Sequence, residues 1–395
     1  MLKNLPENWS STRLEDVCDR ITVGHVGSMA DKYKEIGIPF LRSQNVHPFK
    51  IDLNNVKYID EEFNLKLKKC ALKPGDVAVV RTGYPGTAAV IPESLLVANC
   101  ADLVVITPSS KLNSWYLSCL FNSIWGKGRV AGNLVGVAQQ HFNVGAAKAL
   151  QIPLPPLPIQ KRIAGILSAY DNLIAVNTRR IEALEEMTRR TYEEWFVHYR
   201  FLGGNGTRPD HWKNKRIDEI IDRFSTGKKY NKKTVNSIGQ VPVLDQGKSG
   251  IIGYHDGTPG YQASNANPVI VFANHTCYQK IIFCPFSTIQ NVIPFKPKRE
   301  LDLSLYWLHY ATNGTLELND YKGHWPQFSS QKITVPSPQN AKDFESFVKP
   351  KLLTVQNLQL QNANLCAQRD LLLPRLISGE IEVSDAPLPT VEAAE

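Results

Sequence analysis

The sequence lacks paired cysteines and long apolar runs. Its seven cysteines are scattered and form no Cys-x-x-Cys pair, which argues against a disulfide framework or a zinc cluster. No stretch approaches the roughly 18 apolar residues that a membrane span needs. Residues 1–10 are polar, with an early Trp9 in place of a signal-peptide core. We therefore expect a cytoplasmic protein with reduced cysteines and no membrane partner.

Sequence signatures of DNA-modifying enzymes are also missing. Base methyltransferases need an Asn/Asp-Pro-Pro-aromatic motif, but the chain offers only Pro155-Pro156 and Asn267-Pro268. The run from Gly126 to Ala131 resembles a dinucleotide fingerprint, yet the preceding segment 115–125 has the pattern of a helix and not of a strand. The sequence therefore predicts no catalytic residue, no metal site and no cofactor bound to this chain.

An internal repeat organises the 395 residues. The segment WSSTRLEDVCDR at 9–20 returns as WKNKRIDEIIDR at 212–223, with a constant offset. Two copies of one unit occupy 1–155 and 206–337. Each copy has the pattern of a short opening helix followed by short β-branched strands, which Gly, Pro and Asn separate. We expect an α+β protein with two similar mixed domains.

A long helix is predicted after each copy, over 156–203 and 338–380, with a flexible tail at 381–395. Apolar residues alternate in steps of four and three, which is typical of a coiled-coil seam. Pro350 is expected to kink or delay the second helix. An antiparallel pairing of the two helices would place a similar domain at each end. The seam positions that we single out are Ile163, Leu167, Ile174, Ile181, Leu184, Trp195, Val355, Leu358, Leu365 and Leu372.

Each seam carries an asparagine near its middle, Asn177 and Asn362. In an antiparallel pair these two side chains could lie level and hydrogen-bond, which would fix the register. The alternative is that both face solvent and fix nothing.

The net charge of +8 and the pI near 9.0 are compatible with a nucleic-acid partner. Four lysines surround an aromatic residue in one loop, and such a loop can neutralise phosphates. A solvated charge run without a ligand is the alternative. The residues of this loop are Lys228, Lys229, Tyr230, Lys232 and Lys233.

Three further pairs of loops follow predicted strands or helices at matching places in the two copies. They carry the side-chain types that hydrogen-bond to base edges or phosphates. The first copy contributes Arg42, Gln44, Asn45, Arg81, Thr82, Tyr84, Gln139, Gln140 and His141. The second contributes Gln246, Lys248, Asn274, His275, Lys322 and His324. Because the copies share scaffold residues but differ in these loops, we expect them to read different DNA segments.

The chain resembles the specificity subunit of type I restriction–modification systems. The resemblance rests on WSSTRLEDV at 9–17, KPGDVAVVRTG at 73–83, IPLPPLPIQKRI at 152–163 and QRDLLLPRLISGEI at 368–381. It covers nearly the whole chain except the tail after Val383. At the second junction, VPSPQN at 335–340 lacks the Gln-Lys-Arg of the first, which puts the docking of a partner there in doubt.

This resemblance implies two target recognition domains that read the halves of an interrupted double-stranded DNA sequence. It also implies helices that set the spacing and dock two methyltransferase subunits, with restriction motor-nuclease subunits joining for cleavage. S-adenosylmethionine, Mg²⁺ and ATP are then expected on those partners.

Two other classes of function remain open. A self-contained DNA-modifying enzyme with diverged catalytic residues would methylate or cleave DNA alone. A coiled-coil protein scaffold would bind DNA without sequence preference.

Overall fold

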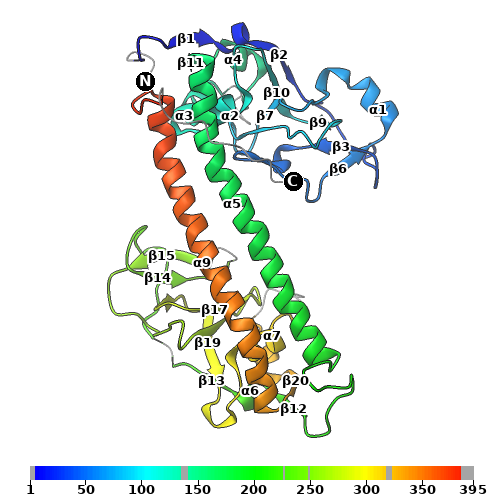
Figure 1. Ribbon diagram of the computed structural model, residues 1–395, viewed down its shortest axis with the longest axis vertical. Coiled ribbons are helices and arrows are strands. Elements are labelled where there is room, and N and C mark those ends of the chain that lie inside the picture. The colour runs from blue at the N-terminus through cyan, green and yellow to red at the C-terminus, as the bar shows by residue number, and fades with distance from the viewer. Residues whose placement is uncertain (1–4, 135–140, 226, 248–249, 317–322, 384–395) are drawn as a thin grey trace. The chain divides into compact units, whose positions relative to one another are not determined.

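The computed structural model describes residues 5–134, 141–225, 227–247, 250–316 and 323–383. The chain divides into two compact units. Unit 1 comprises residues 1–177 and 361–395, and unit 2 comprises residues 178–360. Each unit therefore contains one copy of the repeat together with part of each long helix, so the helices are shared between the units (Figure 1).

Unit 1 is built on a four-stranded antiparallel sheet in the order β2-β10-β7-β8. A second sheet has the order β6-β3-β9, in which β3 and β9 run parallel. Two strand pairs, β1 with β11 and β4 with β5, complete the unit. The strands are β1 Ser10–Arg13, β2 Cys18–Val23, β3 Ile38–Leu41, β4 Val46–His47, β5 Lys50–Ile51, β6 Lys57–Ile59, β7 Val77–Val80, β8 Ala88–Val90, β9 Asn99–Cys100, β10 Leu103–Pro108 and β11 Gln151–Leu154.

Unit 2 repeats this topology. Its four-stranded sheet has the order β13-β19-β16-β17, its second sheet the order β15-β14-β18 with β14 and β18 parallel, and β12 pairs with β20. The agreement confirms that the chain contains a duplicated domain. The strands are β12 Lys213–Arg216, β13 Ile221–Arg223, β14 Val241–Leu244, β15 Ile251–His255, β16 Val269–Ala273, β17 Gln279–Ile282, β18 Ser287–Thr288, β19 Val292–Pro297 and β20 Lys332–Val335.

The start of each copy differs from the prediction of an opening helix. Each copy opens with a strand, β1 or β12, that pairs antiparallel with the last strand of the same copy. A single helical turn follows, Leu14–Val17 in the first copy and α6 (Ile217–Ile220) in the second. The apolar spacing that we assigned to a helix belongs mostly to this one turn, whose buried residues anchor it in the core.

Short helices cover the sheets. Unit 1 has α1 (Glu61–Lys66), α2 (Ser114–Asn122), α3 (Ile124–Ala131) and α4 (Val144–Ala149), with 3-10 turns at Ser43–Asn45 and Lys68–Cys70. Unit 2 has α7 (Leu305–Thr312) and α8 (Trp325–Ser330), with a 3-10 turn at Arg299–Leu301. Asn113, Ser123, Asn143 and Ser304 accept backbone hydrogen bonds at the starts of α2, α3, α4 and α7, as N-cap residues do.

The two long helices are α5 (Leu157–Tyr192), which continues as a π-helical turn at Glu193–Val197, and α9 (Pro338–Ile377). They pair antiparallel as a coiled coil. Contrary to the prediction, α9 runs without a break through Pro350. Proline removes one backbone donor, which leaves the carbonyl group of Ser346 without its helical partner. Because Ser346 and Pro350 are both exposed, water can bind that carbonyl oxygen.

The two asparagines do meet. In unit 1, Asn177 donates from Nδ2 to Oδ1 of Asn362 over 2.9 Å, and Asn177 is 8% exposed. About two turns away, Arg369 donates to Asp171 over 2.6 Å. The partners at 171 and 177 fall at 369 and 362, so the numbering runs in opposite directions and confirms antiparallel packing. Burial raises the pKa of Asp171 despite the neighbouring guanidinium of Arg369.

The core of unit 1 includes the end of α9 and the first residues after it. Ile381 donates its backbone N–H to the carbonyl oxygen of Arg375, and Val383 is buried among core residues. The predicted flexible tail is therefore wrong for residues 381–383, because apolar side chains fix them. The remainder, 384–395, lies outside the described residues.

Candidate nucleic-acid interface

In unit 1, loops that carry predicted DNA-binding residues meet at one end of the sheets. Ala101 donates its backbone N–H to the carbonyl oxygen of Leu41 over 2.9 Å. Arg81 donates from Nη1 to Oδ1 of Asp102 over 2.7 Å and from Nε to the carbonyl oxygen of Phe142 over 3.2 Å. Phe142 returns a backbone hydrogen bond to Arg81. We call the segments joined in this way edge 1: residues 42–45, 81–87, 101–102 and 141–142.

The matching loops of unit 2 meet in the same way. Asn274 donates its backbone N–H to the carbonyl oxygen of Asn291, and His324 donates its own to the carbonyl oxygen of Asn274, both over 2.8 Å. His275 donates its backbone N–H to Oε1 of Gln246 over 2.8 Å. We call these segments edge 2: residues 245–247, 274–276, 289–291 and 323–325. The duplicated scaffold therefore gathers equivalent loops twice.

The lysine-rich loop of unit 2 adjoins edge 2 through strand β18. Tyr230 donates its backbone N–H to the carbonyl oxygen of Thr288, and its ring stacks on that of His255 with centroids 4.3 Å apart. Lys228 lies above the same ring, with Nζ 5.2 Å from the centroid. The loop is thus anchored by its buried tyrosine.

The lysines of this loop differ in exposure. Lys228, Lys232 and Lys233 are exposed, whereas Lys229 is half-buried and lies 3.5 Å from Oγ1 of Thr288. Burial, assisted by the positive charge of Arg223, lowers the pKa of Lys229. The three exposed lysines are therefore the better candidates for contacts with phosphates.

A serine and a histidine lie together beneath this loop, but their hydrogen bonds do not form a nucleophilic pair. Gly257 donates its backbone N–H to Nδ1 of His255 over 3.1 Å. In the neutral ring Nε2 then carries the proton and donates to Oγ of Ser287, 2.9 Å away. To act as a base towards Ser287, His255 would need an unprotonated Nε2, which is the opposite tautomer. We therefore assign to these two residues the support of the loop.

Several predicted residues are engaged inside the loops that carry them. Asn45 is 1% exposed, accepts at Oδ1 from the backbone N–H of Arg42 and donates from Nδ2 to the carbonyl oxygen of Asp52. Thr82 donates from Oγ1 to Oδ2 of Asp102 over 2.9 Å. Asn274 accepts at Oδ1 from the backbone N–H of Trp325 over 2.8 Å. We assign to these side chains the positioning of the loops, because each already binds another part of its edge or loop.

Other predicted residues face outward. Gln44 is exposed, and Tyr84 is 84% exposed at the turn between β7 and β8. Arg42 is half-buried and donates from Nη2 to the carbonyl oxygen of Asn55 over 2.9 Å. The side chains of His141, His275 and Gln246 are intermediate in exposure, and His324 is buried. The predicted residues Gln139, Gln140, Lys248 and Lys322 lie outside the described residues.

The run from Gly126 to Ala131 that resembles a dinucleotide fingerprint has a packing role. It forms α3 directly after α2, so a helix and not a strand precedes it. A Cβ atom on Gly126 would lie 1.9 Å from the carbonyl oxygen of Leu120, so close packing of α3 on α2 requires glycine there. Within the described ranges, no three His, Cys, Asp or Glu side chains are grouped as a metal site would need.

Comparisons with known proteins agree with this arrangement. Residues 6–186 match the family model described as "Type I restriction modification DNA specificity domain". The putative type I restriction enzyme MjaX specificity subunit of Methanocaldococcus jannaschii is 29% identical over 263 residues, which span 62% of this chain but 60% of that subunit, less than two thirds of its length. The MjaIX specificity subunit of the same organism is 21% identical over 96% of this chain and 95% of that one.

The solved S subunit of a type I restriction-modification system from M. genitalium has the same fold. It aligns over 94% of this chain and 96% of its own, with a TM-score of 0.61 at 15% identity. The chain is thus similar to specificity subunits of type I restriction enzymes, and residues 6–186 match the DNA specificity domain of that family. The match to the family model covers the first repeat and most of α5, and the MjaIX alignment extends through the second repeat.

The predicted coiled-coil seam is partly covered by the chain itself. Ile163 and Leu167 are fully buried, and Val355 and Leu358 are each 5% exposed. The other predicted seam residues are partly buried. The docking of partner subunits by this seam stays a prediction, because six of the ten side chains remain partly exposed. The large apolar residues of α5 and α9 that are exposed are Leu173, Val176 and Leu371 in unit 1 and Met187, Phe347 and Leu360 in unit 2.

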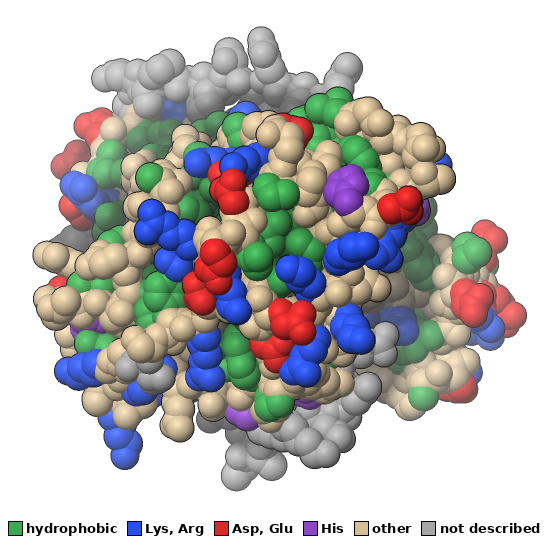
Figure 2. Space-filling view, turned by 90° about the horizontal axis from the view of Figure 1, so that it is seen from below, with side chains coloured by type: hydrophobic (Ala, Val, Ile, Leu, Met, Phe, Trp, Pro, Cys, Tyr) green, Lys and Arg blue, Asp and Glu red, His purple; other side chains and the backbone are tan. Residues whose placement is uncertain are grey.

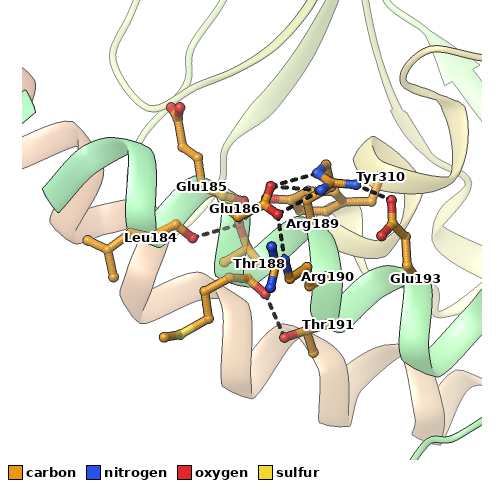
Figure 3. A network of polar contacts seen from close by, with 10 residues as sticks. Leu184, Glu185, Glu186, Thr188, Arg189, Arg190, Thr191, Glu193 and Tyr310 are labelled. Atoms are coloured by element: carbon orange, nitrogen blue, oxygen red, sulfur yellow. Dashed lines mark hydrogen bonds and ion pairs between the residues drawn. The ribbon is translucent and has the colours of Figure 1, made fainter. Parts of the chain in front are cut away.

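In the part of α5 that belongs to unit 2, charged residues pair along the helix (Figure 3). Arg189 contacts Glu186 and Glu193, and Arg190 also contacts Glu186. Thr188 accepts a hydrogen bond of 2.6 Å from the hydroxyl group of Tyr310 on α7. This last contact joins the helix to the second repeat, while the ion pairs are exposed and contribute little to stability.

Charge of both signs also lies on the face seen in Figure 2, where Lys and Arg side chains adjoin Asp and Glu side chains. Positive charge alone therefore does not distinguish the lysine-rich loop from other surfaces of the protein; the close grouping of its lysines does. None of the helices in the described ranges combines the length and the apolar character that crossing a membrane requires.

One residue that organises edge 1 escaped the sequence analysis. Asp102 holds both Arg81 and Thr82 and adopts a left-handed backbone conformation, with φ of 52°. An aspartate tolerates this conformation better than most residues. The sequence signal that could have identified Asp102 is its position directly before the apolar run 103–106.

Proposed function

We propose that this chain is a non-catalytic, sequence-specific DNA-binding protein. In this proposal edge 1 and edge 2 each read one half of an interrupted double-stranded target. The observation that carries it is that one scaffold occurs twice and gathers equivalent loops, whereas the outward side chains differ. Edge 1 presents Gln44 and Tyr84, and the loop beside edge 2 presents Lys228, Lys232 and Lys233.

The partners follow from the family. We propose that two methyltransferase subunits and restriction motor-nuclease subunits assemble with this chain on DNA in the cytoplasm. S-adenosylmethionine, Mg²⁺ and ATP would then act on those subunits. The names of the relatives, specificity subunits of type I restriction enzymes, support this assignment.

The proposal is tested by selecting bound molecules from random duplex DNA, with the chain alone and with its methyltransferase subunits. A bipartite motif with a constant gap is expected. Gln44→Ala should change base preference in one half of the motif, whereas Lys228→Gln should weaken binding without altering the preferred bases. Recovery of unenriched DNA with every set of partners would favour a coiled-coil scaffold with non-specific DNA affinity.

The same material distinguishes a self-contained enzyme. Methylation or cleavage of DNA by the isolated chain, with S-adenosylmethionine or Mg²⁺ added, would contradict the non-catalytic assignment. A matched preparation that carries Lys228→Gln, Lys232→Gln and Lys233→Gln controls for contaminating activity, because it should lose DNA affinity but a contaminant should not.

We further propose that the paired helices set the gap between the half-sites. Deleting one heptad from each helix, for example 178–184 and 355–361, should shorten the preferred gap while leaving both half-site sequences unchanged. An unchanged gap in the selected DNA would refute this role of the helices.

A further inference from the structure

Tyr84 is the most exposed aromatic residue of the described part of the chain, and no contact within that part accounts for its exposure. Its ring is 84% exposed, compared with 39% for Phe347, the next most exposed. An exposed tyrosine loses contact area that would otherwise contribute to folding. Its place on edge 1 ties it to the proposed function, on which the following inference rests.

The turn that carries Tyr84 has an anchored base. Arg81 is held by Asp102 and by the carbonyl oxygen of Phe142, and Thr82 is held by the same carboxylate. A Cβ atom on Gly86 would lie 3.1 Å from Val130, so the returning side of the turn packs on α3. These contacts limit the motion of the segment at both of its ends.

The tip of the same turn stands clear of the other described residues. A Cβ atom on Gly83 would meet nothing within 4 Å. Gly83 and Gly86 have φ of 80° and 87°, a conformation that glycine adopts without strain. Tyr84 and Thr87 close the tip by backbone hydrogen bonds, in which Tyr84 donates to Thr82 and Thr87 donates to Tyr84. The result is a narrow, preorganised projection with an aromatic ring at its end.

The charge around the projection suits DNA. The carboxylate of Asp102, the acidic group at its base, is paired with the guanidinium of Arg81 over 2.7 Å. Residues 81–87 (RTGYPGT) contain no acidic side chain that would repel phosphates. Apolar and aromatic side chains inserted between base pairs unstack a step and bend the duplex, and stacking tolerates any base.

We infer that Tyr84 inserts its ring at a base step of the half-site bound by edge 1 and stacks on the exposed base. Asp102 is a positioning residue for it, since it fixes the start of the turn through Arg81 and Thr82. The equivalent turn in edge 2 carries no such projection. Its residue His275 is bound through the backbone to Gln246, and its side chain is partly buried. Insertion is thus confined to one half of the target.

The test uses the chain in complex with its methyltransferase subunits and a duplex of the selected target. 2-Aminopurine replaces one base at a time in each half-site, and its fluorescence rises where a base loses its stacking partner. The wild type should raise the fluorescence at one step of the half-site read by edge 1. Tyr84→Ala should abolish that rise and weaken binding by roughly 5- to 150-fold.

Three further variants separate stacking from other roles. Tyr84→Phe keeps the ring and should behave as the wild type. Asp102→Asn should reduce the rise, because it removes the charge that holds Arg81. Leu96→Ala is the matched control, since Leu96 is 73% exposed but lies beyond the other end of β8, and it should change nothing.

Several outcomes would overturn the inference. If Tyr84→Phe fails like Tyr84→Ala, the hydroxyl group reads the DNA and stacking is refuted. A rise that persists in Tyr84→Ala comes from another group and also refutes it. If wild-type and Tyr84→Ala complexes select the same motif with equal affinity, insertion is wrong but the proposed function stands. If the wild type selects no motif, the proposed function itself fails.

Discussion

The hydrogen bond between Asn177 and Asn362 gives the sharpest test of the coiled coil. Replacing one asparagine by leucine leaves the other amide in the seam without its partner. An unsatisfied buried amide costs about 1–3 kcal/mol, whereas replacing both partners by apolar groups is nearly neutral or stabilising. Asn362 is less buried than Asn177 and lies 3.4 Å from the carbonyl oxygen of Ile174, so we expect the lower part of this range.

We therefore expect Asn177→Leu to destabilise the helix pair by about 1–2 kcal/mol and the double variant Asn177→Leu/Asn362→Leu to recover most of that loss. Hydrogen exchange of backbone amides in 170–180 measures the effect locally, which avoids assuming that both units unfold together. A loss of 1.4 kcal/mol corresponds to about tenfold faster exchange where the helix closes faster than its open form exchanges.

Asn172→Leu is the matched control, because Asn172 lies on the same helix but is exposed. It should leave the exchange rates nearly unchanged. If the double variant loses as much stability as the two single variants together, the asparagines do not interact and the packing described for the seam is wrong at this position. If the double variant recovers its stability but Asp171 and Arg369 no longer pair with each other, the two asparagines fix the register of the helices.

Three other predictions concern single sites. Burial lowers the pKa of His309 from 6.5 to about 4. The folded state therefore favours the neutral ring, and unit 2 loses stability as the pH falls from 6.5 towards 4. The loss is about 3 kcal/mol at most, because the ring is not fully covered. The denaturation midpoint of the wild type should fall over this pH range, whereas that of His309→Asn should not. Gly126→Ala should destabilise unit 1 by about 3 kcal/mol or more through overpacking, whereas Gly128→Ala, which meets nothing within 4 Å, should stabilise it by roughly 0.5–1 kcal/mol in urea titrations. Replacing Lys228, Lys232 and Lys233 by glutamine should lower the slope of log affinity against log salt by up to about 3, and an unchanged slope would mean that the loop does not touch phosphates.

The duplication and the helices could be predicted because their signals are local and repeated. The offset between 9–20 and 212–223 identified the two copies, and the alternation of apolar residues identified α5 and α9. Pro350 misled the prediction, since its cost depends on whether the carbonyl that loses its partner faces water, which sequence alone does not say. The opening strands were missed because β1 and β12 gain their stability from partners more than a hundred residues away.

The candidate site was harder to predict because a side chain's role depends on what its polar atoms already bind. Arg81 and Asn45 have the chemistry of base-reading residues, yet their hydrogen bonds shape loops. Seam residues such as Leu167 have the chemistry of a docking surface, yet the chain buries them in its own core. Residue type therefore indicated which loops form the edges, while the structure decided which side chains remain available.

The contrast between the two edges bears on how one scaffold serves two targets. A hydrogen bond from the backbone of one loop to another does not depend on side chains, so contacts such as Ala101 to Leu41 and Asn274 to Asn291 hold the loops whatever their sequence. Outward residues can then change without loss of the fold, because exposed substitutions alter stability by less than about 0.5 kcal/mol. This separation of scaffold from surface explains why a projecting tyrosine at edge 1 and an exposed lysine loop beside edge 2 coexist in a duplicated domain. Under the proposed function, the two halves of the target would be held by different forces, and salt would weaken the contacts near edge 2 more than those at edge 1.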